Sequence, residues 1–65
     1  MSGYAVKWRV DTIEELLDNG HLSKNNSGDV VQALNDLNTH FKYGNISENR
    51  YDYLKCKLDD ILNNG

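Results

Sequence analysis

Few residues of this 65-residue chain are of the types that carry out covalent chemistry. The single thiol is Cys56, and the two histidines are His21 and His40. A catalytic thiol needs a nearby base that takes its proton, and neither histidine stands in a recognisable local motif. We therefore interpret Cys56 as a small, partly buried helix residue, because free cysteine packs like a small apolar side chain. We expect no catalytic residue and no enzymatic activity.

The same residues are too few for a structural metal centre. A typical zinc site takes four nitrogen or sulfur ligands, whereas the chain holds one Cys and two His. The sequence also contains no Gly-rich phosphate loop, nucleophile elbow or H-E-x-x-H motif. We expect neither a metal nor a cofactor.

Residues suited to binding another macromolecule are more frequent. The first predicted helix carries four acids, Asp11, Glu14, Glu15 and Asp18. They form a docking surface for a basic partner, a weak divalent-ion site, or a solvated helix face that complements the helix dipole, which is the favoured interpretation. Aromatic side chains are enriched at protein interfaces, because they bury a large area at little entropic cost. The predicted partner-binding residues are Tyr4, Trp8, Tyr43, Tyr53, Glu14 and Asp18.

A second combination of residues, Lys7-Trp8-Arg9, suits nucleic acid. Together with Lys24, these side chains could stack on a base and contact phosphate. The alternative is a strand whose Trp8 packs on the helices. The chain has a net charge of -3 and a pI of about 5.1, and an acidic surface repels a phosphate backbone. Nucleic acid is therefore the less favoured partner.

The lengths of the apolar runs indicate the cellular compartment of the protein. None reaches the length of a signal peptide or of a membrane span, so we expect a cytoplasmic protein without a membrane partner. At 65 residues the chain predicts one domain, 1–65. A domain of this size with no disulfide or metal is marginally stable, which favours association with a partner.

The N-terminal segment 1–10 has the alternation of a half-buried strand. Tyr4, Val6, Trp8 and Val10 fall on one side, and Ala5, Lys7 and Arg9 on the other. The chain offers no convincing second strand, and a lone strand leaves its backbone groups without partners. The segment must therefore pack as an extended arm or pair with another chain, and the second alternative predicts a homo-oligomer.

Helical spacing of apolar residues predicts three helices, over residues 11–19, 27–43 and 47–62. The first two helices end at Gly20 and Gly44, because glycine adopts the left-handed conformation that closes a helix. We predict that Asp11 or Thr12, Ser27 and Ser47 cap the three helices, and that Asp36 faces away from the core. The predicted core is Ile13, Leu16, Leu17, Val30, Val31, Leu34, Leu37, Phe41, Leu54, Leu58 and Ile61, with Leu22 and Ile46 plugging the turns.

The two turns show a repeat of 24 residues, in which Gly20-His21-Leu22-Ser23 matches Gly44-Asn45-Ile46-Ser47. The glycine reverses the chain, the apolar residue plugs the turn and the serine caps the next helix. Two such turns predict an up-down-up arrangement of three helices. Either chance or duplication accounts for the similarity, and the turn argument holds in both cases.

The sequence Gly44-Asn45-Ile46-Ser47-Glu48 is followed by Tyr51 and then by Lys55-Cys56-Lys57-Leu58. With these residues the segment 44–58 resembles the short C-terminal domain family, SHOCT, and the resemblance extends over about residues 36–62. It implies a helical hairpin that has no catalytic residues and that serves association. Arg50 stands where that family usually has an acid, and Asp59 where it has an apolar residue. The matching residues are Gly44, Ile46, Ser47, Glu48, Tyr51, Lys55, Lys57 and Leu58.

These observations predict a mostly α domain of three small helices with an extended or β-like N-terminal segment. The leading function is that of a small, non-enzymatic regulator or inhibitor that binds a partner protein and occupies its surface. The alternatives are a homo-oligomeric assembly module and a weak nucleic-acid-binding accessory protein. By composition the short, Asn-rich, Pro-free chain is similar to accessory proteins of phages and mobile elements.

Overall fold

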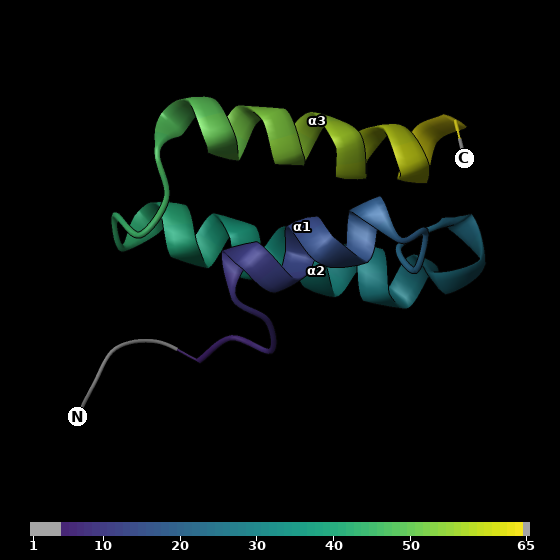
Figure 1. The fold of residues 1–65 in the computed structure, drawn as a ribbon, viewed down its shortest axis with the longest axis horizontal. Helices are drawn as coiled ribbons and strands as arrows, with labels where there is room; N and C mark the ends of the chain where they lie inside the picture. Colours follow the sequence, from purple (N-terminus) through teal and green to yellow (C-terminus); the bar gives the residue numbers. More distant parts are fainter. Residues whose placement is uncertain (1–4, 65) are drawn as a thin grey trace.

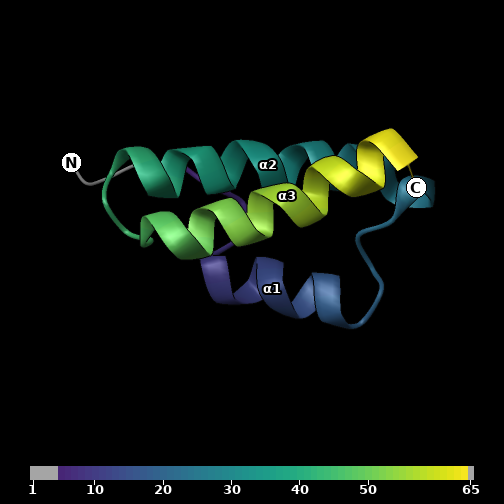
Figure 2. The same cartoon turned by 90° about the horizontal axis from the view of Figure 1, so that it is seen from above.

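Three α-helices and one short 3-10 helix form the structure, a computed structural model that describes residues 5–64. The elements are α1 (Val10–Asp18), η1 (Lys24–Asn26), α2 (Ser27–Lys42) and α3 (Glu48–Asn64). Together they form a triangular bundle in which α3 lies across both α1 and α2 (Figures 1 and 2). The prediction of a mostly helical domain with three helices is confirmed, and the predicted helix ends are within two residues of the observed ones.

The two glycine turns use the same backbone hydrogen bonds. Gly20 and Gly44 have φ angles of 81° and 75°, which is the left-handed region that favours glycine. After Gly20 the amide of His21 donates to the carbonyl of Leu16 at 3.0 Å, and after Gly44 the amide of Asn45 donates to His40 at 2.9 Å. These bonds satisfy carbonyls that the helix ends leave open. The shared closure accounts for the repeated turn sequence.

The serines that follow the two turns behave differently. Ser47 caps α3 as predicted, because its Oγ accepts the amide of Arg50 at 3.3 Å. Ser23 precedes η1 and makes no capping hydrogen bond through its side chain. Ser27, the predicted cap of the second helix, is instead its first residue and follows Asn26. The predicted Asp11 or Thr12 cap is also wrong, because α1 already starts at Val10, after Arg9, with no side-chain cap.

The core lies where the three helices meet and contains a fully buried set that includes Ile13, Leu37 and Leu54. Leu22 is buried and Ile46 packs against the core, so both turns are plugged as predicted. Ala33 is a core residue that the pattern missed, because its small side chain gives a weak apolar signal. The buried apolar residues are Val10, Ile13, Leu22, Val30, Ala33, Leu37, Leu54 and Leu58, and the predicted Leu16, Leu17, Leu34 and Ile61 pack against them while partly exposed.

The predicted strand does not form in residues 5–9, which are the described part of the N-terminal segment ahead of α1. The chain bends at Lys7 and Trp8, and the amides of both residues donate to Oδ2 of Asp36 at 3.0 and 2.9 Å. Successive amides of a strand point to opposite sides, so two of them can meet on one oxygen only where the chain bends. Val10, the predicted end of the arm, is drawn into the core as the first residue of α1.

Candidate protein-binding surface

One side of α2 leaves large apolar side chains in contact with solvent. Val31, Leu34, Asn38 and Phe41 recur at intervals of three and four residues, so they share a stripe of the helix. Val31 is 46% exposed and Phe41 is 41% exposed. Both were predicted as core residues, and that prediction is wrong for them. The apolar side chains of α2 cover a wider part of the helix surface than the core can bury. Val30 and Leu37 fill the core, and the stripe of Val31 and Phe41 beside them stays in solvent.

Residues of α3 continue this stripe across the helix pair. The Tyr51 ring stacks on Phe41, with centroids 4.2 Å apart and an interplanar angle of 11°. The hydroxyl of Tyr51 donates to Oδ1 of Asn38. Tyr51 and Leu62 are partly buried against the core and lie on one side of α3 at a spacing of eleven residues. We call Val31, Leu34, Phe41, Tyr51 and Leu62 the α2–α3 face.

The opposite flank of α2 is closed by buried polar side chains. Asp36 is 2% exposed and His40 is 4% exposed, although the sequence pattern placed Asp36 towards solvent. Besides the amides of Lys7 and Trp8, the Asp36 carboxylate accepts Nε2 of Gln32 at 2.8 Å. His40 Nε2 lies 2.9 Å from the carbonyl of Trp8 and donates to it, since a carbonyl only accepts. A buried carboxylate with three donors is tolerated, because each donor replaces a hydrogen bond to water.

The third side of the bundle, between α1 and α3, is bridged by an ion pair. The guanidinium of Arg50 donates to Glu14 and, at 2.9 Å, to Asp11. These hydrogen bonds, to Glu14 first and then to Asp11, raise the pKa of Arg50. The pair fixes α1 against the first turn of α3, so part of the acidic cluster serves the fold.

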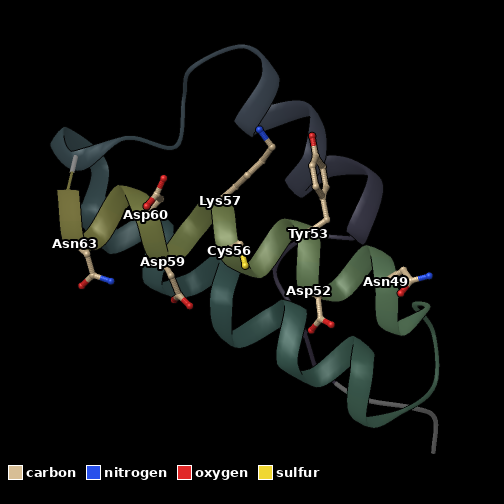
Figure 3. Close-up of a pocket in the computed structure, with 8 residues that line it drawn as sticks. All are labelled: Asn49, Asp52, Tyr53, Cys56, Lys57, Asp59, Asp60 and Asn63. Atoms are coloured by element: carbon tan, nitrogen blue, oxygen red, sulfur yellow. The ribbon is translucent and has the colours of Figure 1, made fainter.

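Three of the predicted partner-binding residues lie towards this third side. Glu14 contacts Arg50, and the exposed Asp18 lies one helical turn beyond Glu14. Tyr53 is 56% exposed, and Figure 3 shows Tyr53 and Lys57 projecting to the side of α3 on which α1 lies. The ammonium of Lys57 stands 5.1 Å from the centre of the Tyr53 ring. This surface is charged and polar, unlike the α2–α3 face.

The other predicted residues are not brought together with these three. Tyr43 is the C-cap of α2 and is 53% exposed. Trp8 is partly buried against the core, and the Lys7 ammonium lies over its ring at 4.8 Å. That arrangement matches the interpretation in which Trp8 packs on the helices and leaves less of its ring for stacking on a base. Tyr4 lies outside the described residues.

Cys56 occupies the outer side of α3, where it is exposed. The expectation of a partly buried Cys56 is therefore wrong. Cys56 lies on the side of α3 that faces away from the core, so its side chain is in solvent. A shallow depression lies here, but all of its lining residues belong to α3, and their side chains diverge to both sides of the helix (Figure 3). The histidines are engaged elsewhere: His21 with Asp29 at 3.0 Å, and His40 with Trp8.

Comparison with known proteins found no match: no family model fits the chain, and neither a curated protein nor a solved structure is significantly similar to it. The described residues hold no cluster of three or more His, Cys, Asp or Glu side chains arranged to bind a metal ion. Of the helices within residues 5–64, none has both the length and the apolarity that a membrane crossing requires.

Proposed function

We propose that the protein is a small, non-enzymatic regulator that binds a partner protein through the α2–α3 face and occupies the surface of that partner. The observation that carries this proposal is the exposure of Val31 and Phe41 on one stripe of α2. Large apolar side chains that stay in solvent on one side of a helix are typical of sites for other proteins. The stacked pair of Phe41 and Tyr51 adds the rigid aromatic area that interfaces favour.

The charge around the face favours a partner with basic residues beside its apolar contact. The chain has a net charge of -3. Figure 3 shows Asp52 and Asp59 on the side of α3 that faces α2. Asp59 is paired with Lys55 at 3.2 Å, whereas Asp52 is exposed. The stripe of α2 has the spacing into which an apolar helix of a partner fits. We therefore propose an amphipathic, basic-edged helix as the segment that this face binds.

The experiment compares capture of a partner by three forms of the full chain. Immobilised wild type, Val31→Lys and Tyr53→Ala are incubated with lysate of the source organism, and captured proteins are quantified by mass spectrometry. Val31→Lys places a charge on the α2–α3 face at an exposed position, so its effect on folding is expected to be small. Tyr53→Ala is the matched control, because it removes an exposed aromatic side chain from the other side of α3.

The proposal expects one protein that wild type and Tyr53→Ala retain equally and that Val31→Lys loses by about ten-fold or more, the size of a hot-spot effect. A protein lost with Tyr53→Ala but kept with Val31→Lys would move the site to the α1–α3 side. Analytical sedimentation of the same three proteins tests the remaining alternative, that the face binds a second copy of this chain. A dimer that Val31→Lys dissociates would make a second copy of the chain the occupant, and the protein an assembly module.

A further inference from the structure

Residues 5–9 are fastened to the bundle by side chains of α2. One oxygen of Asp36 accepts the amides of Lys7 and Trp8, and His40 donates to the carbonyl of Trp8. Gln32 holds the other Asp36 oxygen, which fixes the carboxylate in place. The three α2 residues stand four apart, on one flank of the helix. Asp36 and His40 therefore present acceptor and donor groups to three successive peptide units of the segment, and Gln32 supports the carboxylate.

The segment can leave these side chains without breaking a helix. Its junction with α1 is Arg9, an extended residue with φ -76° and ψ 163°, and the first α1 hydrogen bond runs from the Ile13 amide to the Arg9 carbonyl. The buried apolar set starts at Val10, and of residues 5–9 only Trp8 packs against it. Detaching residues 5–8 consequently costs the hydrogen bonds to α2 and the Trp8 contact, while the helix–helix core stays intact.

We infer that residues 5–8 form a strap that opens as a separate unit, with Arg9 as its junction, while the three helices stay folded, and that Asp36 holds the strap closed as its catch. Local openings of this kind involve segments with few buried apolar contacts and a small number of hydrogen bonds. Opening uncovers Asp36, His40 and Gln32 on the flank of α2 opposite the α2–α3 face. The strap therefore covers a second, polar surface of α2 in the ground state, and this surface reaches solvent only when the strap opens.

Amide hydrogen exchange of the full chain, followed by NMR at low urea concentrations, tests this inference. In the wild type, exchange of the Lys7 and Trp8 amides should depend weakly on urea, because opening the strap exposes little surface. The amides of Leu37, Leu54 and Leu58 should depend on it steeply. The same steep dependence for Lys7 and Trp8 would mean that the strap opens only with the whole molecule, and would overturn the inference.

A variant pair tests the catch itself. Asp36→Asn keeps the shape of the side chain but removes its charge, and Asp52→Asn makes the same change at an exposed position of α3. Exchange of the Lys7 and Trp8 amides should accelerate by about ten-fold in Asp36→Asn, the loss expected for charge-assisted hydrogen bonds. Because Asp36→Asn destabilises the closed state relative to both the opened and the unfolded state, the core amides should accelerate by a similar factor, but only they should keep a steep dependence on urea. Asp52→Asn should behave as wild type. No acceleration at Lys7 and Trp8 in Asp36→Asn, or a urea dependence there as steep as that of the core amides, contradicts Asp36 as the catch of a separately opening strap.

The only tryptophan of the chain provides an independent optical readout. Quenching of Trp8 fluorescence by acrylamide should increase in Asp36→Asn, while the helical circular dichroism stays unchanged. Loss of helical signal together with increased quenching would instead show general unfolding and overturn a separate opening of the strap.

Discussion

The two flanks of α2 reverse the usual rule that polar side chains are exposed and large apolar side chains are buried. On one flank the carboxylate of Asp36 and the imidazole of His40 are almost completely buried, while on the other Val31 and Phe41 remain more than two-fifths exposed. The buried flank is covered by the chain's own residues 7 and 8. The exposed flank is left open beside α3, with only the Tyr51 ring stacked on Phe41.

The difference teaches that burial in this small bundle follows available partners as much as side-chain polarity. Asp36 tolerates burial because two backbone amides and one side-chain amide donate to it, and a buried polar group with partners costs little. Val31 stays exposed because α1, α3 and the N-terminal segment cover the other sides of α2. This short chain therefore keeps apolar side chains of one α2 flank in solvent.

The largest loss of unfolding free energy is expected from a substitution in the core, which lies between the two flanks of α2. Leu37→Ala, at a fully buried position, should lower the free energy of unfolding by about 3 kcal/mol, from lost burial and the cavity left behind. Val31→Ala should cost under about 1 kcal/mol, because the side chain is already half in solvent. Urea unfolding followed by circular dichroism gives both values. Equal costs at the two positions would break the comparison, since they would place Val31 in a core.

Removing the buried carboxylate should have the next largest effect. Asp36→Ala leaves the amides of Lys7 and Trp8 and the Gln32 side chain without their acceptor, which costs about 2 kcal/mol of unfolding free energy. Asp52→Ala, an exposed acid on α3, should stay within about 0.5 kcal/mol of wild type. An Asp36→Ala protein as stable as Asp52→Ala would show that the polar flank is not packed as described.

The bridged side of the bundle offers an intermediate case. Arg50→Gln should lower the free energy of unfolding by about 0.5–1 kcal/mol, because an exposed ion pair is screened by solvent, and the loss should shrink at high salt. The raised pKa of Arg50 means that its contribution is present below that pKa and is lost only as the pH rises through it, far above neutral. The difference from wild type should therefore be the same at pH 7 and pH 9. A difference that disappears between these pH values would contradict this assignment.

The smallest effect is expected from Gly28, in the first turn of α2. A methyl group added there meets open space, so Gly28→Ala should raise the free energy of unfolding by about 0.5–1 kcal/mol through helix propensity. Gly44→Ala should have the opposite sign, because Gly44 has a φ of 75°. Thermal unfolding distinguishes the two. Gly28→Ala touches neither flank of α2, so it supplies a stabilised background for the costlier variants.

The sequence predicted the parts of the fold that are set locally. Helical spacing located all three helices, and Gly20, Gly44 and Ser47 located their ends, because these features depend on neighbouring residues only. The pattern failed where distant residues meet. Asp36 is buried by amides 28 and 29 positions away, and no local signal records that partnership.

None of the residues of the α2–α3 face was among the predicted partner-binding residues, and that earlier assignment stays a prediction. Spare aromatic residues correctly indicated exposed side chains at Tyr43 and Tyr53, but the exposed Val31 and Phe41 were assigned to the core. The width of the apolar arc on α2 was the signal that could have found them. The role of Arg50 became visible only through its contacts with Asp11 and Glu14.

Side-chain exposure in solution tests the central claim most directly. A soluble paramagnetic agent, added at low protein concentration, broadens NMR signals in proportion to their exposure. The two-flank account predicts strong broadening of the Val31 methyl groups and the Phe41 ring, and protection of the Leu37 methyl groups and the Asp36 carboxyl carbon. Protected Val31 and Phe41 together with a broadened Asp36 would show α2 turned the way the apolar pattern alone predicts, and would contradict the account.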